Sequence, residues 1–518
     1  MKTKEVLLSI DAGTQSVRVL AFDRRGKLID YAQVIYKEPY FSTNPDWAEQ
    51  DAEFLWEQLT IACHRLWSQN KVLPESILGV SVSTQRGTVI NLDENGQPIR
   101  PAILWLDQRR ATKLPSPGLL FRGATNLIGL KGTIDHLLKE AEVNWLQEHE
   151  PETMKKTKHY LFLSGYFNYR LTGEFVDSIA NQVGYVPFNY KKQAWEHSSH
   201  WKWKGLPIDF NALPTLISPG EVLGEITEKA ALETGLPKGL AVISGASDKA
   251  AELIGAGCTE LTQGCISYGT TATISVNSKK YIEPYRFIPP YPSGYPNAYN
   301  IEVQTSRGYW MVSWFKEQFG HLEQWEADEQ NIPAEDLLDK LAATVEPGSM
   351  GLMLQPYWSP GIRYPGPEAK GAIIGFGSVH KKEHFYRSIL EGIAYAIREG
   401  KEKIERKTGV AMKEIYICGG GSKSNQAMQI TADILNVEVR RPSEFETAGL
   451  GAAVLTAVGT GVYENIDIAI KEMTTVKEVF TPNPVAREIY NDMYTAIYTK
   501  MYQRVKPLYS QIKRITEL

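Results

Sequence analysis

The sequence predicts a layered fold of the α/β or α+β class, built from two related halves. Predicted strands and helices alternate in part along the chain, which is typical of such layers. A strand, a Gly/Thr turn and a second strand span 6–22, and the same pattern returns at 265–276 as a weak internal repeat. The length of 518 residues fits two large domains or about three of average size.

The first half opens with an antiparallel meander. Two β-rich runs flank the segment DAGTQS at 11–16, which has the turn residues of a hairpin. A third run follows the turn at 23–26, and a stretch with apolar residues at mixed helical spacing comes next. The predicted strands are 6–10, 17–22, 28–36, 77–82 and 89–92, and the predicted helix is 45–68.

The second half continues after its hairpin with a strand at 414–418, a tight turn of glycines at 419–421 and a helix at 424–435. Glycine lets a ligand approach the backbone, and a helix N-terminus favours anions or polar rings. The glycine turn is therefore a candidate ligand site, to which Asn425 could add a polar contact. A tight turn without a ligand explains the same pattern.

We place the boundary between the halves near 248–257, which divides the chain into domains of 1–250 and 251–518. The segment 281–299 is rich in Tyr and Pro and reads as an irregular excursion. It could be a substrate lid, an oligomer contact such as a homodimer interface, or a structural loop.

The composition is that of an ordinary globular protein, with 43% hydrophobic and 22% charged residues. The net charge of −4 gives no bulk attraction for nucleic acid or an anionic membrane. Four cysteines are too few for a disulfide framework. The uncharged stretch 447–463, rich in apolar and small residues, is shorter than a membrane helix needs and predicts a buried helix of small residues. We expect a cytoplasmic protein with neither nucleic-acid nor membrane partners.

The first Gly/Thr turn is a candidate phosphate site. Asp11 stands at a strand end, where a carboxylate can hold Mg²⁺ through water, and the turn's backbone N–H groups can form an anion-binding nest. Thr14, Gln15 and Ser16 add side-chain donors, and Arg18 could reach a phosphate. An ordinary hairpin whose Asp satisfies the turn amides explains this pattern equally well.

Gly269 and Thr270 form the same device in the second half, so the two turns together permit a clamp on a phosphate chain. Asp248 follows an apolar strand at 240–243 and precedes a small-residue helix, where open sheets place their ligands. Such a carboxylate could accept a proton from a substrate hydroxyl, or it could simply cap the helix. The chain contains no P-loop motif.

Taken in order, a set of segments resembles the FGGY family of carbohydrate kinases, which includes glycerol, xylulose, ribulose and gluconate kinases. Each segment is weak alone, but the ordered set is specific and extends over nearly the whole chain. The segments are DAGT at 11–14, WAEQD at 47–51, STQR at 83–86, ILWLDQR at 103–109, RLTGE at 170–174, TGLP at 234–237, GASD at 245–248, YGT at 268–270, 365–371, EG at 391–392, GGGSKS at 419–424 with AD at 432–433, and ETAGLGAA at 446–453.

The resemblance implies two ribonuclease H-like, actin-type domains with the active site in the cleft between them. It also implies ATP-dependent phosphorylation of a hydroxyl on a small sugar, sugar alcohol or sugar acid, of which a pentose or pentulose fits best. The domain 1–250 would then bind the sugar and carry the first phosphate loop, and the domain 251–518 would bind ATP.

Residue by residue, the resemblance places Asp248 as the catalytic base, with Asp11 and Asp248 at Mg²⁺. The implied ATP-binding residues are Thr14, Gln15, Ser16, Arg18, Gly269, Thr270, Gly308, Gly420, Gly421 and Asn425. The implied substrate-binding residues are Arg86, Trp105, Asp107, Asp248 and Lys249.

Two departures from the family pattern concern the sugar. Where glycerol kinases carry Arg-Glu and xylulose kinases carry Met-His, this chain has Arg86-Gly87, so neither subfamily fits cleanly. Lys249 stands where glycerol kinases place Gln, and it could pair with an acidic sugar such as an aldonate or be a surface charge. An actin- or chaperone-like ATPase and a catalytically silent sugar sensor are the alternative functions.

Overall fold

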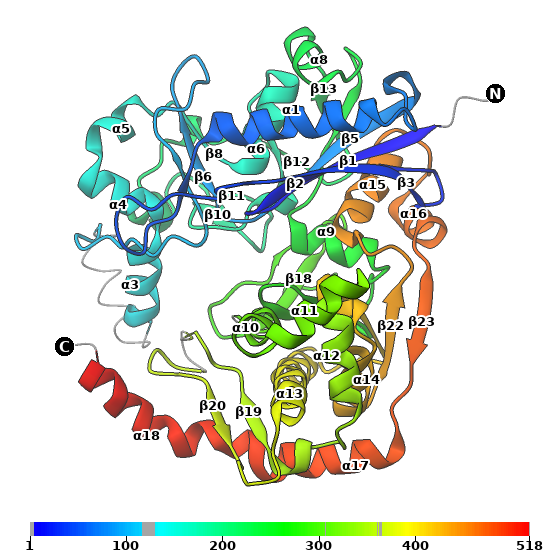
Figure 1. The fold of residues 1–518 in the computed structure, drawn as a ribbon. Helices are drawn as coiled ribbons and strands as arrows, with labels where there is room; N and C mark the ends of the chain where they lie inside the picture. Colours follow the sequence, from blue (N-terminus) through cyan, green and yellow to red (C-terminus); the bar gives the residue numbers. More distant parts are fainter. Residues whose placement is uncertain (1–4, 116–129, 306, 360, 362–364, 517–518) are drawn as a thin grey trace.

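The structure is a computed structural model in which two lobes are stacked one above the other (Figure 1). Each lobe is built on one mixed sheet, six-stranded in the first and seven-stranded in the second. Helices α9 (Asp248–Gly255) and α15 (Thr447–Gly459) lie at the junction of the lobes. The residues that the structure describes are 5–115, 130–305, 307–359, 361 and 365–516.

The sheet of the first lobe has the strand order β13-β14-β5-β1-β2-β3. Strands β1, β2 and β3 form the predicted antiparallel meander, while β5 pairs parallel with both β1 and β14. Helix α1 (Ala52–Ser68) covers one face, where Leu55, Leu59 and Leu66 are fully buried. The strands are β1 (Val6–Ala12), β2 (Ser16–Phe22), β3 (Leu28–Ile35), β5 (Ile77–Thr84), β13 (Val222–Glu225) and β14 (Ala241–Ile243).

The predicted helix over 45–68 begins only at Ala52. The Asp51 side chain accepts a hydrogen bond from the Glu53 backbone N–H (2.8 Å) and caps the helix there. Glu49 and Gln50, the two residues before Asp51, pair instead within a second, four-stranded sheet of order β4-β7-β6-β8. Its strands are β4 (Glu49–Gln50), β6 (Val89–Leu92), β7 (Ala102–Ile103) and β8 (His159–Phe162).

The sheet of the second lobe has the order β17-β18-β16-β15-β21-β22-β23. Helix α13 (Lys382–Thr408) is its largest buried element, with one face in the main core of this lobe. The strands are β15 (Gln263–Tyr268), β16 (Ala272–Ser278), β17 (Tyr291–Pro292), β18 (Tyr299–Thr305), β21 (Glu414–Cys418), β22 (Glu438–Pro442) and β23 (Val476–Phe480).

The two sheets share one topology, which confirms the internal repeat that the sequence predicts. Strands β15, β16 and β18 pair antiparallel in succession, as β1, β2 and β3 do. Strand β21 joins β15 in parallel and β22 joins β21 in parallel, which repeats the arrangement of β5 and β14. Each lobe therefore presents an equivalent strand–turn–strand hairpin at the centre of its sheet.

Helices α9 and α15 cross in very close contact. A Cβ on Gly255 would lie 1.9 Å from the Thr447 carbonyl oxygen, and a Cβ on Gly451 would lie 1.9 Å from the Ala251 carbonyl oxygen. Only glycine at these two positions permits the crossing. Helix α15 also binds the sheet of the first lobe, because the Ser81 hydroxyl on β5 donates to the Ala452 carbonyl (2.7 Å).

The predicted buried helix over 447–463 is thus confirmed as α15, and no helix in the described part of the chain is long and apolar enough to cross a membrane. Together with α16 (Ile466–Met473), α15 packs against the first lobe in one hydrophobic cluster. Two helices from beyond the predicted boundary at 250 therefore complete the core of the first lobe.

The remaining elements surround the two sheets. In the first lobe they are α3 (Lys131–Glu140), α4 (Glu142–His149), α5 (Pro151–Lys156), α6 (Leu163–Thr172), α7 (Trp201–Gly205), α8 (Glu228–Thr234), β9 (Val176–Ser178), β10 (Phe188–Asn189), β11 (Ala194–Trp195) and β12 (Thr215–Ile217). In the second lobe they are α10 (Trp310–Phe319), α11 (His321–Gln330), α12 (Ala334–Ala343), α14 (Asn425–Leu435), α17 (Pro484–Met493), α18 (Thr499–Thr516), β19 (Met353–Gln355) and β20 (Ala372–Ile374).

Candidate active site

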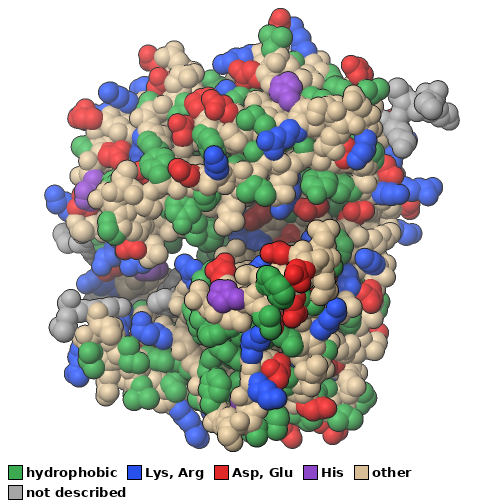
Figure 2. Space-filling view, viewed as in Figure 1, with side chains coloured by type: hydrophobic (Ala, Val, Ile, Leu, Met, Phe, Trp, Pro, Cys, Tyr) green, Lys and Arg blue, Asp and Glu red, His purple; other side chains and the backbone are tan. Residues whose placement is uncertain are grey.

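The molecular surface is hollowed between the two lobes, and charged side chains of both signs lie in the recess (Figure 2). Asp11 lies near the end of β1, directly across the hairpin from Arg18 on β2. Their side chains pair at 3.4 Å, and Arg18 also lies 3.4 Å from Glu446, which precedes α15. Burial raises the pKa of Asp11 to about 6, although Arg18 opposes this shift and the charge of Asp248 adds to it. A buried carboxylate among other carboxylates is an environment that a cation would stabilise.

The turn after β1 is held by contacts from its own lobe. The Gly13 N–H donates to the Ser16 carbonyl (3.0 Å), and the Gln15 carbonyl accepts from Tyr36 N–H (2.8 Å). The Ser16 hydroxyl lies 3.1 Å from the amide group of Gln33. These bonds fix the backbone of the first predicted phosphate loop.

Thr14 and Trp105 lie together beside this turn. The Thr14 hydroxyl donates to Gln85 Oε1 (2.5 Å), and the Trp105 indole N–H reaches both Thr14 Oγ1 (3.0 Å) and Gln85 Oε1 (3.1 Å). The Trp105 side chain is nonetheless exposed over a large part of its ring. The structure thus joins a predicted ATP-binding residue to a predicted substrate-binding residue.

Asp248 is the first residue of α9, and Ser247 occupies the N-cap position. The chain bends there after β14, and a Cβ on Gly245 would lie 2.1 Å from the Val82 carbonyl oxygen, so the bend requires glycine. One Asp248 oxygen accepts the Lys249 backbone N–H (2.7 Å) and lies 3.8 Å from Arg86 Nε. With 36% of its side chain exposed, Asp248 is open to a ligand.

Arg86 follows β5 in the first lobe and forms a two-pronged ion pair with Glu302 on β18 of the second lobe. Its Nη1 and Nη2 donate to the two Glu302 oxygens at 3.2 and 3.0 Å. The guanidinium also lies over the Tyr291 ring, 5.1 Å from its centroid. Glu302 and Tyr291 were not predicted from the sequence. Tyr291 belongs to the segment 281–299, which therefore contributes a contact to this site.

Two predicted substrate residues are already engaged by protein groups. The Lys249 ammonium donates to the Ser267 hydroxyl (2.5 Å) and to Glu252 (3.2 Å). Burial disfavours this charge, but Glu252 and Asp248 outweigh it and raise the pKa of Lys249. The buried Asp107 carboxylate accepts from Ala48 N–H (2.7 Å) and from the Arg109 guanidinium (2.7 and 2.8 Å). Asp107 thereby fixes the loop that carries Trp105.

The predicted nucleotide residues of the second lobe lie around two tyrosines, Tyr268 and Tyr309, whose rings stack at 5.1 Å. A Cβ on Gly421 would lie 2.5 Å from the Tyr309 ring, whereas a Cβ on Gly420 would meet nothing within 4 Å. Gly420 therefore presents bare backbone to open space.

Gly308 lies beside the second Gly/Thr turn. A Cβ on it would lie 2.5 Å from the Ala272 Cβ, and the Trp310 N–H donates to the Thr270 carbonyl (3.3 Å). Gly269 closes the turn through its N–H to the Thr271 carbonyl (3.1 Å). At the start of α14, Asn425 Oδ1 accepts from Arg441 (2.7 Å), so its amide oxygen is already bonded.

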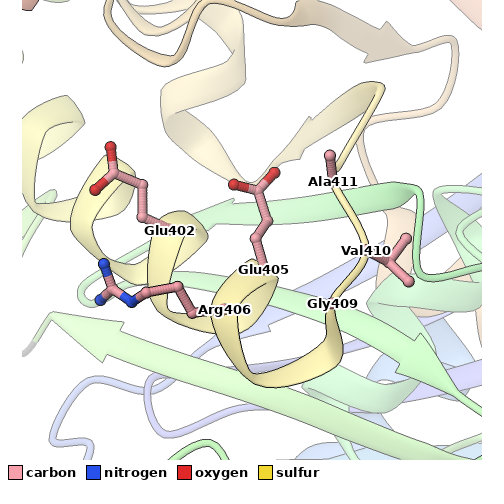
Figure 3. Close-up of a pocket in the computed structure, with 6 residues that line it drawn as sticks. All are labelled: Glu402, Glu405, Arg406, Gly409, Val410 and Ala411. Carbon is pink, nitrogen blue, oxygen red and sulfur yellow. The ribbon is translucent and has the colours of Figure 1, made fainter.

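A second cavity lies away from these residues. A shallow cavity of about 450 Å³ at the C-terminus of α13 is lined by polar and small residues (Figure 3). The Glu405 carboxylate there already pairs with Lys401 (2.9 Å) and accepts from Met412 N–H (2.8 Å). No cluster of three or more His, Cys, Asp or Glu that could hold a metal occurs in the part of the chain that the structure describes.

Family models match both halves of the chain. The N-terminal domain of the FGGY family of carbohydrate kinases matches residues 6–255, and the C-terminal domain matches residues 264–460. The chain belongs to the FGGY family of carbohydrate kinases. It is accordingly a phosphotransferase that acts on a hydroxyl group of a carbohydrate.

Relatives match over nearly the whole length. An uncharacterized sugar kinase of Escherichia coli strain K12, YgcE, is 32% identical over 96% of this chain and 93% of its own. A xylulose kinase of Staphylococcus epidermidis is 28% identical over 99% of both chains.

Solved structures show the same fold. A ligand-bound xylulose kinase from Lactobacillus acidophilus superposes with a TM-score of 0.82 at 21% identity, over 98% of this chain and 99% of that one. A Plasmodium falciparum glycerol kinase with ADP superposes with a TM-score of 0.76 at 20% identity, over 96% and 98%. The predicted fold with two ribonuclease H-like, actin-type domains is confirmed.

Proposed function

We propose that this FGGY kinase transfers the γ-phosphoryl group of Mg-ATP to a hydroxyl of a small sugar or sugar alcohol, with Asp248 as the general base. One observation carries the proposal. Asp248 is a partly exposed carboxylate whose charge acts on Asp11 of the first hairpin, and it lies 3.8 Å from Arg86 of the Arg86–Glu302 pair, which joins the two lobes. A hydroxyl that contacts Asp248 would therefore sit between the lobes, where ATP and sugar have to meet.

The two hairpins would hold the nucleotide. Backbone N–H groups of the first turn and the side chains of Thr14 and Arg18 are donors for phosphate oxygens, and Gly269 and Thr270 provide the equivalent turn in the second lobe. The bare backbone at Gly420 leaves room for a flat ring next to the start of α14. The first lobe would thus bind the sugar and one end of the triphosphate, and the second lobe would bind the adenosine.

Asp11 and Asp248 have the chemistry that a magnesium site needs. Both are hard oxygen donors, and burial disfavours the charge of Asp11 more than its 3.4 Å pair with Arg18 stabilises it, so a cation there would be favourable. Mg²⁺ bound there would neutralise charge on the phosphate oxygens. Because Mg²⁺ keeps several waters and binds substrate phosphates, a two-carboxylate site suffices without a third protein ligand.

Asp248 would accept the proton of the attacking hydroxyl as its oxygen approaches the γ-phosphorus. Phosphoryl transfer needs positioning and charge neutralisation rather than covalent help from the protein. Arg86 Nε, 3.8 Å from an Asp248 oxygen, is a charged partner that would hold that carboxylate in place. Enclosure of the reacting groups between the lobes would exclude water, which is itself an acceptor for the phosphoryl group.

The test is a coupled assay of ADP release with glycerol, xylulose, ribulose and gluconate as acceptors. We expect at least one acceptor to stimulate ADP release, and Asp248→Asn to reduce that kcat/KM by at least about a hundredfold, because general-base catalysis contributes ~10²–10⁴. Asp328→Asn, an exposed carboxylate on α11, is the matched control and should retain activity. ADP release that no sugar stimulates would favour an actin-like ATPase, and full activity of Asp248→Asn would exclude Asp248 as the base.

A further inference from the structure

The cations beside Asp248 are already paired with carboxylates. Arg86 is matched by Glu302, and Lys249 is matched by Glu252 at 3.2 Å. Both pairs are largely buried: the side-chain exposures are 17% and 5% for the first pair, and 20% and 9% for the second. Asp248 itself is left over as a negative charge. Among the described residues next to Asp248, neither cation, Arg86 nor Lys249, carries an uncompensated positive charge.

The Arg86–Glu302 pair is the one that a substrate would meet. Arg86 Nε lies 3.8 Å from an Asp248 oxygen, so a hydroxyl in contact with Asp248 would be within a few ångströms of the guanidinium. Glu302 occupies one N–H on each Nη atom, which leaves two Nη–H donors on Arg86. Those donors can bind neutral hydroxyls, but the charge that would attract a carboxylate is cancelled at a distance of about 3 Å.

Neighbouring groups keep the pair in place. The Tyr291 ring lies under the guanidinium at 5.1 Å, and burial raises the pKa of Tyr291, so this ring stays neutral. Tyr291 belongs to β17, which pairs with β18, the strand that carries Glu302. Gly294, in the same segment, packs against α9: a Cβ there would lie 2.6 Å from Ile254 and 3.1 Å from Ala246. The segment 281–299 thus places the Tyr291 ring against Arg86 and adds a strand beside the one that carries Glu302.

The geometry points to Glu302 as a specificity-determining residue that restricts this kinase to uncharged sugars and polyols and excludes aldonates. An aldonate carboxylate near Arg86 would meet the Glu302 charge as well, and like charges held at close range in a buried site repel each other strongly. An uncharged polyol has no such penalty and can use the free Nη–H donors. This inference deepens the proposed function and rests on it.

The first experiment uses the unchanged protein. We would measure kcat/KM for xylulose, ribulose and glycerol, and for gluconate as the aldonate probe. We expect kcat/KM for the best neutral acceptor to exceed that for gluconate by at least about a hundredfold. The reason is that the gluconate carboxylate would be left unpaired in the site, and enzymes discriminate strongly against unpaired polar groups. A kcat/KM for gluconate equal to or above the neutral acceptors would overturn the role of Glu302 and leave the kinase proposal intact. If none of the sugars stimulates ADP release, both the role of Glu302 and the kinase proposal would be wrong.

The second experiment removes the charge of the Glu302 side chain and keeps its shape. Glu302→Gln should raise the ratio of gluconate to neutral-sugar kcat/KM by at least about tenfold, because Arg86 then faces the ligand with its charge uncompensated. Glu302→Asp keeps the charge and should keep the wild-type ratio, and the exposed Glu94→Gln is the matched surface control. If Glu302 only fixes the lobes together, Glu302→Gln would lower kcat/KM for all acceptors equally, and the inference would be wrong. The wild-type ratio decides the question if Glu302→Gln does not fold.

Discussion

Replacing Asp11 by Asn should stabilise the protein at neutral pH while it removes a carboxylate that we propose as a magnesium ligand. Burial raises the pKa of Asp11 in the folded chain from its ordinary 3.8 to about 6. The folded state then holds this proton more tightly than the unfolded state, so the free energy of unfolding falls as pH rises from about 4 to about 6. At ~1.4 kcal/mol per pH unit, the ionised carboxylate costs about 3 kcal/mol near pH 7.

The assay is urea unfolding of the wild type and Asp11→Asn at pH 7.5 and pH 4.5, with Asp328→Asn as the control. We expect Asp11→Asn to unfold at higher urea at pH 7.5, with a gain of up to about 3 kcal/mol that falls to about 1 kcal/mol at pH 4.5. Arg18 keeps Glu446 as a partner at 3.4 Å, so its charge stays compensated. A variant less stable than the wild type at pH 7.5, or a gain that is equal at both pH values, would refute the reasoning.

Two further predictions concern single contacts. Lys249→Ala should lower kcat/KM for gluconate and for neutral sugars by the same factor, because its ammonium already binds Glu252 and Ser267; a loss confined to gluconate in the same assay would contradict this. Gly420→Ala should raise KM for ATP about tenfold and leave the thermal midpoint unchanged, since the added methyl meets only open space. Gly421→Ala should raise KM for ATP and also lower the thermal midpoint, because its methyl group would collide with the Tyr309 ring. Differential scanning fluorimetry with ATP titration checks this pair, and equal thermal midpoints for the two variants would count against it.

Local patterns in the sequence predict much of this fold. Strands over 89–92 and 414–418 match β6 and β21, because short apolar runs bounded by turn residues are strong strand signals. The repeated hairpins could be recognised because each lobe repeats the same strand–turn–strand unit. The sequence predicts the start of α1 too early, because apolar residues continue ahead of the capping residue Asp51.

The candidate site was predicted only in part, for a different reason. Asp248, Arg86 and Trp105 could be chosen because they lie in recognisable segments. Glu302 lies in a strand with no motif, and its partner Arg86 is more than two hundred residues away, so only the tertiary structure joins them. A carboxylate in the buried strand β18 was the one available signal, because a buried charge requires a partner.

The position of α15 bears on how the chain matures during synthesis. The hydrophobic core of the first lobe is complete only when residues 447–473 pack against its sheet. When only the first 250 residues have left the ribosome, α1 can cover one face of this sheet, but the face that packs against α15 and α16 has no cover. Burial of that face has to wait until residues 447–473 have emerged, and apolar surface exposed during synthesis is prone to aggregation.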